Sequence, residues 1–343
     1  MSRQRMGEIL DLSRFSTVEL CHRPTPLELM KNLTAALGGP SIYIKRDDCT
    51  GLATGGNKTR KLEFLIGEAI EQGADTVITQ GAVQSNHARQ TAAAAVKFGL
   101  KCKILLERRV PDTADSYERT GNVLLDRMFG AELEFRPCGT DMNEAAQDLA
   151  ERVREAGGKP YYIPGGGSNR VGALGYVSCA LELLRQADDQ GLRIDRLVHA
   201  TGSAGTQAGL VVGIEGSGGT IPVYGISVRS ARDKQESDVY DLVVDTAEYV
   251  GVEKIARDKV VANDDYVGPG YGLPTPAMVE AVRLLAQTEG ILLDPVYSGK
   301  AMAGLIGEIR KGTFAKDENI VFLHTGGSVA LFAYEALFNN KAA

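Results

Sequence analysis

Residues 75–98, DTVITQGAVQSNHARQTAAAAVKF, contain the unit that decides the fold. The run at 75–79 is typical of a buried strand, and the alanine-rich segment 87–98 is typical of a helix. A short polar loop with one glycine and one serine joins the two. Repetition of a strand, a short loop and a helix builds a parallel sheet covered by helices, so this stretch predicts an α/β fold.

The same alternation continues through most of the chain. Further strands are predicted at 41–45, 102–106, 132–135, 160–163, 196–200, 223–228 and 320–324. Further helices are predicted at 58–72, 117–128, 143–156, 171–186, 205–213, 235–250, 276–289, 299–311 and 328–338. We therefore expect two doubly wound, open twisted sheets with flanking helices. The turn Gly165-Gly166-Gly167 is the expected domain boundary, and the loop 51–57 is the expected first crossing.

Length, composition and charge exclude several classes of protein. The chain has 343 residues, which suggests about two domains. Its 40 glycines have no Gly-X-Y period, so we interpret them as residues of turns, caps and ligand loops. The net charge is −6 and no basic block is present, so no nucleic acid partner is expected. No apolar run reaches the roughly 18 residues of a membrane span, so no membrane partner is expected.

The N-terminus and the cysteines predict the compartment. Segment 1–14 alternates in charge and lacks an apolar core, so we expect no signal peptide. The five cysteines are odd in number and widely spaced: Cys21, Cys49, Cys102, Cys138 and Cys179. This pattern favours neither a disulfide framework nor a metal site, and it is typical of a cytoplasmic protein.

A lysine stands where a helix is predicted to begin. Lys58 follows Gly55, Gly56 and Asn57, and Asn57 is expected to be the N-cap. A helix N-terminus disfavours a cation, so the amine of Lys58 is expected to shift towards its neutral form, which suits a Schiff base. The alternative is a solvated surface lysine.

A second loop, 80–87, follows the strand at 75–79. Ser85 is expected to cap the next helix, so that the amides of Asn86 and His87 would point at an anion such as a carboxylate. The alternative is helix capping without a ligand. No second histidine stands at metal spacing, so no metal site is predicted.

The third loop, 201–209, also opens a predicted helix after a strand. Its small residues would leave backbone amides bare, as in a cradle for one phosphate: Gly202, Ser203, Ala204, Gly205 and Thr206. The spacing fits neither a P-loop nor a dinucleotide fingerprint. The alternative is tight packing of helix against sheet.

A fourth loop, His324-Thr-Gly-Gly-Ser328, could present the neutral hydroxyl of Thr325 to a ligand. Tyr271 and Tyr297 stand on two further Gly/Pro loops, where tyrosines could also serve packing alone. A lysine, a capping hydroxyl, a one-phosphate cradle and a neutral hydroxyl together fit one cofactor, pyridoxal phosphate.

These stretches resemble the family of D-cysteine desulfhydrases, L-cysteate sulfo-lyases and 1-aminocyclopropane-1-carboxylate deaminases, which use pyridoxal phosphate and share the tryptophan-synthase-β-like fold (fold type II). The matching stretches are 24–27, 45–48, 55–63, 84–86, 201–205, 270–272, 294–297 and 324–327. The resemblance implies a small domain, 58–164, inserted into a large cofactor-binding domain, 1–57 and 165–343. It also implies a small amino-acid substrate and a homodimer.

The resemblance implies a role for each candidate. Lys58 would link to the cofactor and move the α-proton, and Asn86 would face the ring oxygen. The substrate carboxylate would be held by Ser85, Asn86 and His87. The phosphate would be held by residues 202–206, with Asn57 and Thr325 also at the cofactor. Acid–base or positioning roles would fall to Ser85, Tyr271 and Tyr297.

Two positions depart from the deaminase pattern. Deaminases that open the cyclopropane ring carry Glu and Leu where this chain has Ser298 and Thr325. A carboxylate near the pyridine nitrogen keeps it protonated and makes a strong electron sink, whereas a hydroxyl leaves it neutral. A weaker sink suffices when a good leaving group sits on the β-carbon. We therefore expect a β-eliminating carbon–sulfur lyase, with Ser298 near the substrate.

The leaving group is open at this point between sulfite from L-cysteate and sulfide from D-cysteine. Arg108 and Arg109 could match a sulfonate, or could form a solvated charge pair. Arg229 and Arg232 also favour an anionic substrate such as cysteate. The alternatives are the cyclopropane deaminase, a nucleotide-dependent oxidoreductase, which would need a proper fingerprint, and a non-catalytic cofactor-binding protein.

Overall fold

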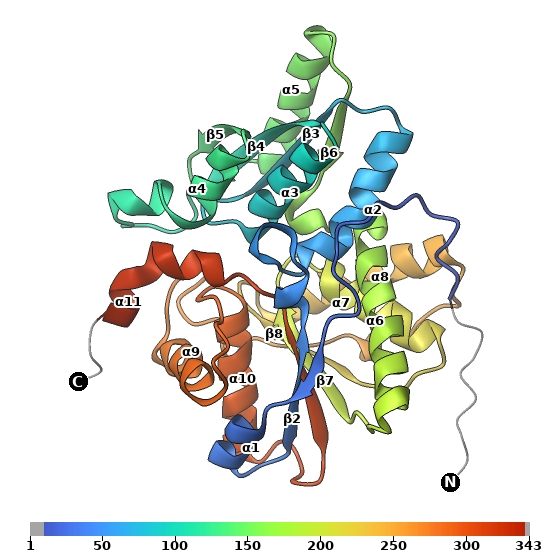
Figure 1. Cartoon of the computed structure of the whole chain (residues 1–343), viewed down its shortest axis with the longest axis vertical. Coiled ribbons are helices and arrows are strands. Elements are labelled where there is room, and N and C mark those ends of the chain that lie inside the picture. Colours follow the sequence, from blue (N-terminus) through green and yellow to red (C-terminus); the bar gives the residue numbers. More distant parts are fainter. Residues whose placement is uncertain (1–9, 340–343) are drawn as a thin grey trace.

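The computed structural model describes residues 10–339, which form two sheets flanked by helices (Figure 1). The larger sheet has six strands, in the spatial order β1 (Leu27–Leu29), β2 (Ser41–Arg46), β10 (Asn319–His324), β7 (Arg196–Thr201), β8 (Val223–Ser227) and β9 (Val261–Asn263). β1 is antiparallel to β2, and the other neighbouring pairs are parallel. The α/β class expected from the sequence is therefore confirmed.

The smaller sheet has four parallel strands from one continuous part of the chain. Their spatial order is β5 (Glu132–Arg136), β4 (Lys101–Glu107), β3 (Thr76–Ala82) and β6 (Pro160–Ile163). All seven residues of β3 are buried, as expected for a central parallel strand covered on both faces.

Eleven α-helices occur between residues 10 and 339. They are α1 (Lys31–Leu37), α2 (Lys58–Glu71), α3 (Asn86–Lys97), α4 (Gly121–Met128), α5 (Met142–Glu155), α6 (Arg170–Gln190), α7 (Gly205–Gly216), α8 (Arg232–Val250), α9 (Pro276–Glu289), α10 (Ser298–Lys311) and α11 (Glu335–Asn339). Short 3₁₀ helices lie at Asp47–Cys49, Leu52–Thr54, Asp115–Glu118, Gly165–Gly167, Arg257–Lys259 and Ser328–Tyr334.

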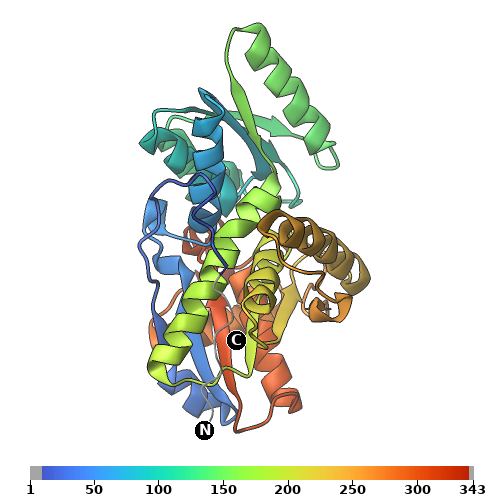
Figure 2. The same cartoon turned by 90° about the vertical axis from the view of Figure 1, so that its right-hand side faces the viewer.

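Each face of the large sheet has its own helices. Successive strand residues point to opposite faces, so Leu197 packs with α6 and α7 whereas Val198 packs with α9 and α10. Figures 1 and 2 show the sheet lying between these two layers. α2 contacts both α6 and α3, so it lies at the junction between the two sheets.

Two predicted helices were wrong in part. The segment 117–128 contains a 3₁₀ turn and then α4, because Gly121 adopts φ +61° and the side chain of Gln84 donates to the carbonyls of Tyr117 (2.5 Å) and Thr120 (2.9 Å). The segment 328–338 is mostly 3₁₀ helix and not α-helix. Three short elements, β1, α1 and β9, had no prediction.

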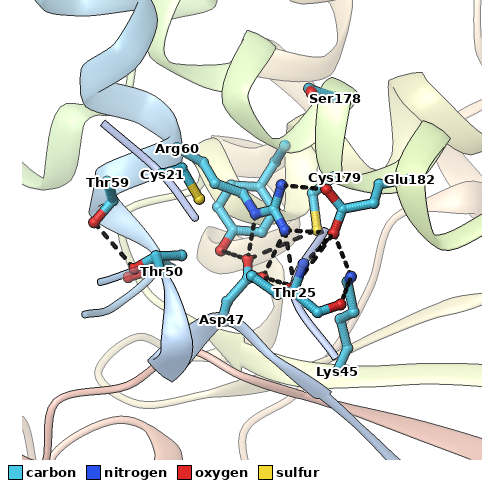
Figure 3. Close-up of polar contacts among 12 residues, drawn as sticks. Cys21, Thr25, Lys45, Asp47, Thr50, Thr59, Arg60, Ser178, Cys179 and Glu182 are labelled. Carbon is cyan, nitrogen blue, oxygen red and sulfur yellow. Dashed lines mark hydrogen bonds and ion pairs between the residues drawn. The ribbon is translucent and has the colours of Figure 1, made fainter. Parts of the chain in front are cut away.

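A buried ionic network ties α2 to the large sheet (Figure 3). The guanidinium of Arg60 donates to Asp47 from Nε (2.8 Å) and to Glu182 from an η nitrogen (2.8 Å). Glu182 also pairs with Lys45. The hydroxyl of Tyr176 donates to Asp47 (2.7 Å). This network fixes the helix that begins with Lys58.

None of the helices within residues 10–339 is both long and apolar enough to cross a membrane. No group of three or more His, Cys, Asp or Glu side chains in this part could hold a metal ion. Residues 1–9 of the segment examined for a signal peptide lie outside the described part of the chain.

Candidate active site

A cavity of about 720 Å³ lies where the loops of both sheets meet. Most of the sequence-predicted site residues line it: Asn57, Lys58, Ser85, Asn86, His87, Gly202, Ser203, Ala204, Thr206, Tyr271, Tyr297 and Thr325. Loops after β3, β4, β7 and β10 contribute to the lining, which is the usual position of a ligand in an open α/β sheet.

Lys58 is the first residue of α2 and is half-buried in the cavity wall. Burial lowers the pKa of its amine to about 8, so a neutral, nucleophilic form is accessible near neutral pH. Gly55 and Gly56 precede it with φ +76° and +128°, a backbone path that other residues rarely adopt.

Asn57 is not the capping side chain that the sequence predicted. Its own backbone is helical and its side chain accepts no hydrogen bond from the helix. Instead, its Nδ2 donates to Thr206 Oγ1 (3.1 Å), and its backbone N–H donates to the carbonyl of Thr325 (3.0 Å). Asn57 therefore joins the lysine loop to two other loops of the cavity.

Lys61 is a second lysine that the sequence analysis missed. It is fully buried, and its Nζ donates to the carbonyl of Gly166 (3.1 Å) and to Ser168 Oγ (3.2 Å). Burial, together with Lys58, holds its pKa well below the usual value. Spacing was an available signal, because residues three apart share one face of a helix.

The loop before α7 forms a concave surface of backbone and small side chains. Ser168 Oγ donates to Ser203 Oγ (3.0 Å) and accepts from the amide of Gly205 (3.2 Å). A Cβ added at Gly205 would lie 2.8 Å from Lys61 Nζ, so glycine keeps the loop close to the lysine. Ala204 has φ +71°, a strained conformation for a residue other than glycine. A helix N-terminus beside an amine fits a phosphate group.

The start of α3 agrees with the expected cap. Ser85 Oγ accepts from the amide of Ala88 (3.2 Å). The first amides of a helix have no partner inside the helix, so those of Asn86 and His87 can receive an anion.

The side chain of His87, unlike its backbone amide, has no free N–H with which to bind an anion. Thr79 Oγ1 donates its only proton to the carbonyl of Ile163 (2.8 Å), so the His87 Nε2, 2.7 Å away, must be the donor of that pair. Burial, with Lys58 and Lys61 nearby, holds the pKa of His87 well below its usual value. The ring is therefore neutral, and its free Nδ1 is an acceptor.

Tyr271 and Tyr297 form a pair at the cavity wall. Their hydroxyl oxygens are 2.6 Å apart, and the rings meet edge to face with centroids 5.8 Å apart. Burial raises the pKa of both hydroxyls, so each keeps its proton at neutral pH. The guanidinium of Arg109 lies over the Tyr271 ring, 5.7 Å from its centroid.

Ser298 does not join the other predicted site residues. It is fully buried, and it is absent from the lining of the cavity. Its Oγ donates to the carboxylate of Asp294 (2.7 Å), which also accepts from the amides of Val296 (3.0 Å) and Tyr297 (3.0 Å). The Ser298 hydroxyl is also 3.3 Å from the carbonyl of Gly326, in the loop that carries Thr325. A contact of Ser298 with the substrate stays a prediction.

The two arginines that follow β4 differ in their position relative to the cavity. Arg109 lines the cavity and pairs with Glu107 (2.5 Å). Arg108 pairs with Glu118 (2.6 Å), half of its side chain is exposed, and it is absent from the lining. Arg229 also lines the cavity.

The residues of the cavity fit pyridoxal phosphate. Lys58 supplies an amine of lowered pKa for the aldehyde, and the loop at 202–206 supplies a cradle that a Cβ at Gly205 would fill. Thr325 supplies a neutral hydroxyl in the lining of the same cavity.

Known proteins give the same indication. The family model described as pyridoxal-phosphate dependent enzyme matches residues 18–326. The D-cysteine desulfhydrases of Salmonella schwarzengrund (strain CVM19633) and Salmonella typhi are each 48% identical to this chain over 323 residues, which is 94% of this chain and 97% of theirs.

Solved structures agree in fold. The crystal structure of an ACC deaminase homologue superposes with a TM-score of 0.87 at 39% identity, and the match covers 95% of this chain and 97% of that one. The structure of an O-ureido-L-serine synthase has a TM-score of 0.65 at 17% identity, over 93% of this chain and 94% of its own, and shows the fold alone. The chain belongs to the family of pyridoxal-phosphate dependent enzymes.

Proposed function

We propose that this chain is a carbon–sulfur lyase that acts on a small amino acid with sulfur on its β-carbon. The observation that carries the proposal is Lys58, an amine of lowered pKa in one cavity with the loop that opens α7. The 48% identity to D-cysteine desulfhydrases over 94% of the chain supports the reaction class.

The overall reaction would break a C–S bond and release the sulfur group with the bonding electrons. D-cysteine and water would give pyruvate, ammonia and hydrogen sulfide. L-cysteate and water would give pyruvate, ammonia and sulfite. Pyridoxal phosphate, when bound, supplies an aldehyde for covalent attachment and a ring that accepts electrons from the α-carbon.

The cofactor would be held by residues from both sides of the cavity. Lys58 would bind the aldehyde through Nζ. The backbone amides of residues 202–206 would hold the phosphate, with Asn57 keeping Thr206 in position through their hydrogen bond. Thr325 would meet the ring nitrogen without protonating it, and Asn86 would meet the ring oxygen.

The substrate would lie between α3 and the tyrosine pair. The amides of Asn86 and His87, with the Ser85 hydroxyl, would hold its carboxylate. Lys58 Nζ would take the proton from the α-carbon, and a tyrosine hydroxyl would donate a proton to the leaving sulfur. The neutral His87 ring would orient the loop without charge.

Thr325 favours elimination over ring opening. A neutral hydroxyl at the ring nitrogen is expected to make a weaker electron sink than a carboxylate, which suits a substrate with a good leaving group. Cyclopropane deamination is the alternative, because an ACC deaminase homologue shares the fold at 39% identity.

Arg109 and Arg229 support an anionic substituent on the substrate. Both line the cavity, whereas Arg108 does not. A planar guanidinium recognises a sulfonate well, so these residues favour L-cysteate over D-cysteine.

The cofactor part is tested by the visible spectrum of the protein purified with pyridoxal phosphate. We expect an absorption band from the covalently bound cofactor, and we expect Lys58→Ala to lose it together with turnover. A band that survives unchanged in Lys58→Ala would overturn the assignment of Lys58.

The substrate part is tested with D-cysteine, L-cysteine, D-cysteate, L-cysteate and the cyclopropane amino acid, with assays for pyruvate, sulfide, sulfite and 2-oxobutanoate. Arg109→Met is expected to raise KM for cysteate roughly tenfold, the effect of one charged hydrogen bond. Arg108→Met is the matched control and should leave KM unchanged. Pyruvate from none of the sulfur compounds would remove the lyase proposal.

The assembly, domain limits and location are also proposals. The family resemblance supports a homodimer and an inserted domain at 58–164. Five free cysteines within residues 10–339 support a cytoplasmic protein. If the chain is not a homodimer, analytical ultracentrifugation at micromolar concentration would show a monomer.

A further inference from the structure

Arg89 is a buried arginine whose hydrogen bonds go to neutral groups. Its side chain is fully buried on α3, one turn from Asn86. One η nitrogen donates to Asn122 Oδ1 (2.8 Å) and to Asn86 Oδ1 (3.3 Å), and the other donates to the carbonyl of Gly55 (2.8 Å). Arg89 therefore bridges the loop before Lys58 and the start of α3.

This bridge fixes which way the Asn86 amide is turned. A guanidinium only donates, so the atom of Asn86 that faces Arg89 must be the oxygen. Asn122 Nδ2 donates to the same oxygen (3.0 Å), while the oxygen of Asn122 is itself fixed by Arg89. The orientation of both amides follows from one residue that is always a donor.

The other end of the Asn86 amide is left for a ligand. Asn86 lines the cavity, and its Nδ2 lies against Gly327, where an added Cβ would come within 2.5 Å of it. Within residues 10–339, Nδ2 donates no hydrogen bond to a protein acceptor. Its N–H groups are therefore free to meet an acceptor in the cavity.

We propose that Arg89 is a positioning residue that turns the amide of Asn86, so that Nδ2 donates to an oxygen acceptor of the bound cofactor. The inference rests on the proposed function, because the acceptor is the ring oxygen of pyridoxal phosphate. Two buried carboxyl groups, Asp126 and Asp294, act on Arg89 through space and not through hydrogen bonds, and burial raises the pKa of both, so they compensate its charge only in part. Its positive charge therefore also favours a negative charge on that oxygen.

The test is a double-mutant cycle on cofactor binding. The apoproteins of wild type, Arg89→Met, Asn86→Ala and the double variant are titrated with pyridoxal phosphate by fluorescence, and thermal unfolding without cofactor reports folding. We expect each single change to raise Kd roughly tenfold, the effect of one hydrogen bond. The double variant should bind within about twofold of Asn86→Ala, because Arg89 acts through Asn86.

A spectroscopic measurement separates positioning from stability. The pH at which the visible band of the bound cofactor changes should shift in Arg89→Met and in Asn86→Ala by similar amounts. Arg89→Lys, which keeps the charge on a single donor nitrogen, should restore part of the affinity. Arg60→Lys is the control for loss of stability: Arg60 is also fully buried, is absent from the lining of the cavity and does not contact Asn86, so this change should lower Tm, and any effect on Kd should add to that of Asn86→Ala instead of vanishing.

The outcomes separate this inference from the proposed function. If wild type fails to bind pyridoxal phosphate, the proposed function fails. If wild type binds it but the two changes are additive, or Arg89→Met leaves Kd and spectrum unchanged, only the role of Arg89 is overturned. Should Arg89→Met not fold, the same cycle is run with Arg89→Lys, whose effect must also vanish in the Asn86→Ala background.

Discussion

Arg60 and Arg89 are both fully buried, yet their surroundings differ in kind. Arg60 lies between two carboxylates, Asp47 and Glu182, and hydrogen bonds to both (Figure 3). Arg89 hydrogen bonds to two side-chain amides and a carbonyl, and its Nε has no partner within the described residues.

The difference appears in the proton affinities. Burial alone would lower the pKa of Arg60, but Asp47 and its neighbours outweigh burial and raise it. For Arg89 burial dominates and lowers the pKa to about 10, because Asp126 and Asp294 offset it only in part. In the Arg60 network, which we call saturated, buried carboxylates compensate the charge of the arginine, and the network stabilises the fold. The charge of Arg89, next to the cavity, is compensated only in part. Incomplete compensation of a buried charge therefore distinguishes the candidate site from the structural network beside it.

The largest expected effect comes from breaking the saturated network. Asp47→Ala leaves Arg60 without one of its two buried carboxylates, and removing one partner of a buried ion pair costs about 3–5 kcal/mol. The free energy of unfolding in urea should fall by that amount. Glu280→Ala, which removes an exposed pair with Arg310 (2.6 Å), is the control and should cost about 1 kcal/mol or less. Equal losses for both variants would contradict the comparison.

An intermediate effect is expected next to Arg89. Burial raises the pKa of Asp126 to about 8, so the folded protein holds a proton that the unfolded chain releases. The bound proton contributes to the free energy of unfolding. This contribution is fully present below the unfolded pKa of 3.8 and is lost as pH rises towards 8. Asp126→Asn removes the titration, so its free energy of unfolding should gain on the order of 3 kcal/mol on that of wild type between pH 5 and pH 8. Urea unfolding at both pH values measures this; parallel pH profiles would show that Asp126 is ionised in the folded protein.

The smallest expected effect concerns a single hydrogen bond of the saturated network. Tyr176→Phe removes the hydroxyl that donates to Asp47 but leaves both bonds from Arg60. We expect a loss of about 1.5 kcal/mol, typical of a hydrogen bond to a charged group. Thermal unfolding measures the loss, and the Kd for pyridoxal phosphate should not change. A weaker Kd would mean that the network also shapes the cavity.

The sequence predicted those elements whose residues repeat with a clear period. The α3 segment was placed within one residue at both ends, and the β3 segment within one residue at its start and three at its end, because an apolar strand and an alanine-rich helix meet at a capping serine. The segment 117–128 failed because Gln84, far away in the sequence, takes the carbonyls that a continuous helix would use. Local propensity cannot include a partner that tertiary packing supplies.

Within the candidate site, glycine loops after strands were informative and single side chains were less so. Lys58 and the loop at 202–206 face one cavity, as their patterns predicted. For Ser298 the spacing does not show that Asp294, four residues earlier, accepts a hydrogen bond from its hydroxyl, so its role at the substrate stays a prediction. Arg89 and Lys61 lie in quoted stretches, but their burial beside other polar groups is a property of the fold alone.

The order of strands has a consequence for synthesis on the ribosome. All four strands of the smaller sheet lie between residues 76 and 163, so that sheet can pair as soon as this segment has emerged. The larger sheet cannot, because β10, at residues 319–324, inserts between β2 and β7. The nascent chain therefore holds β2 and its buried charges without their central neighbour until almost the last residues are made. A truncation before residue 319 should expose this unpaired edge and require a chaperone.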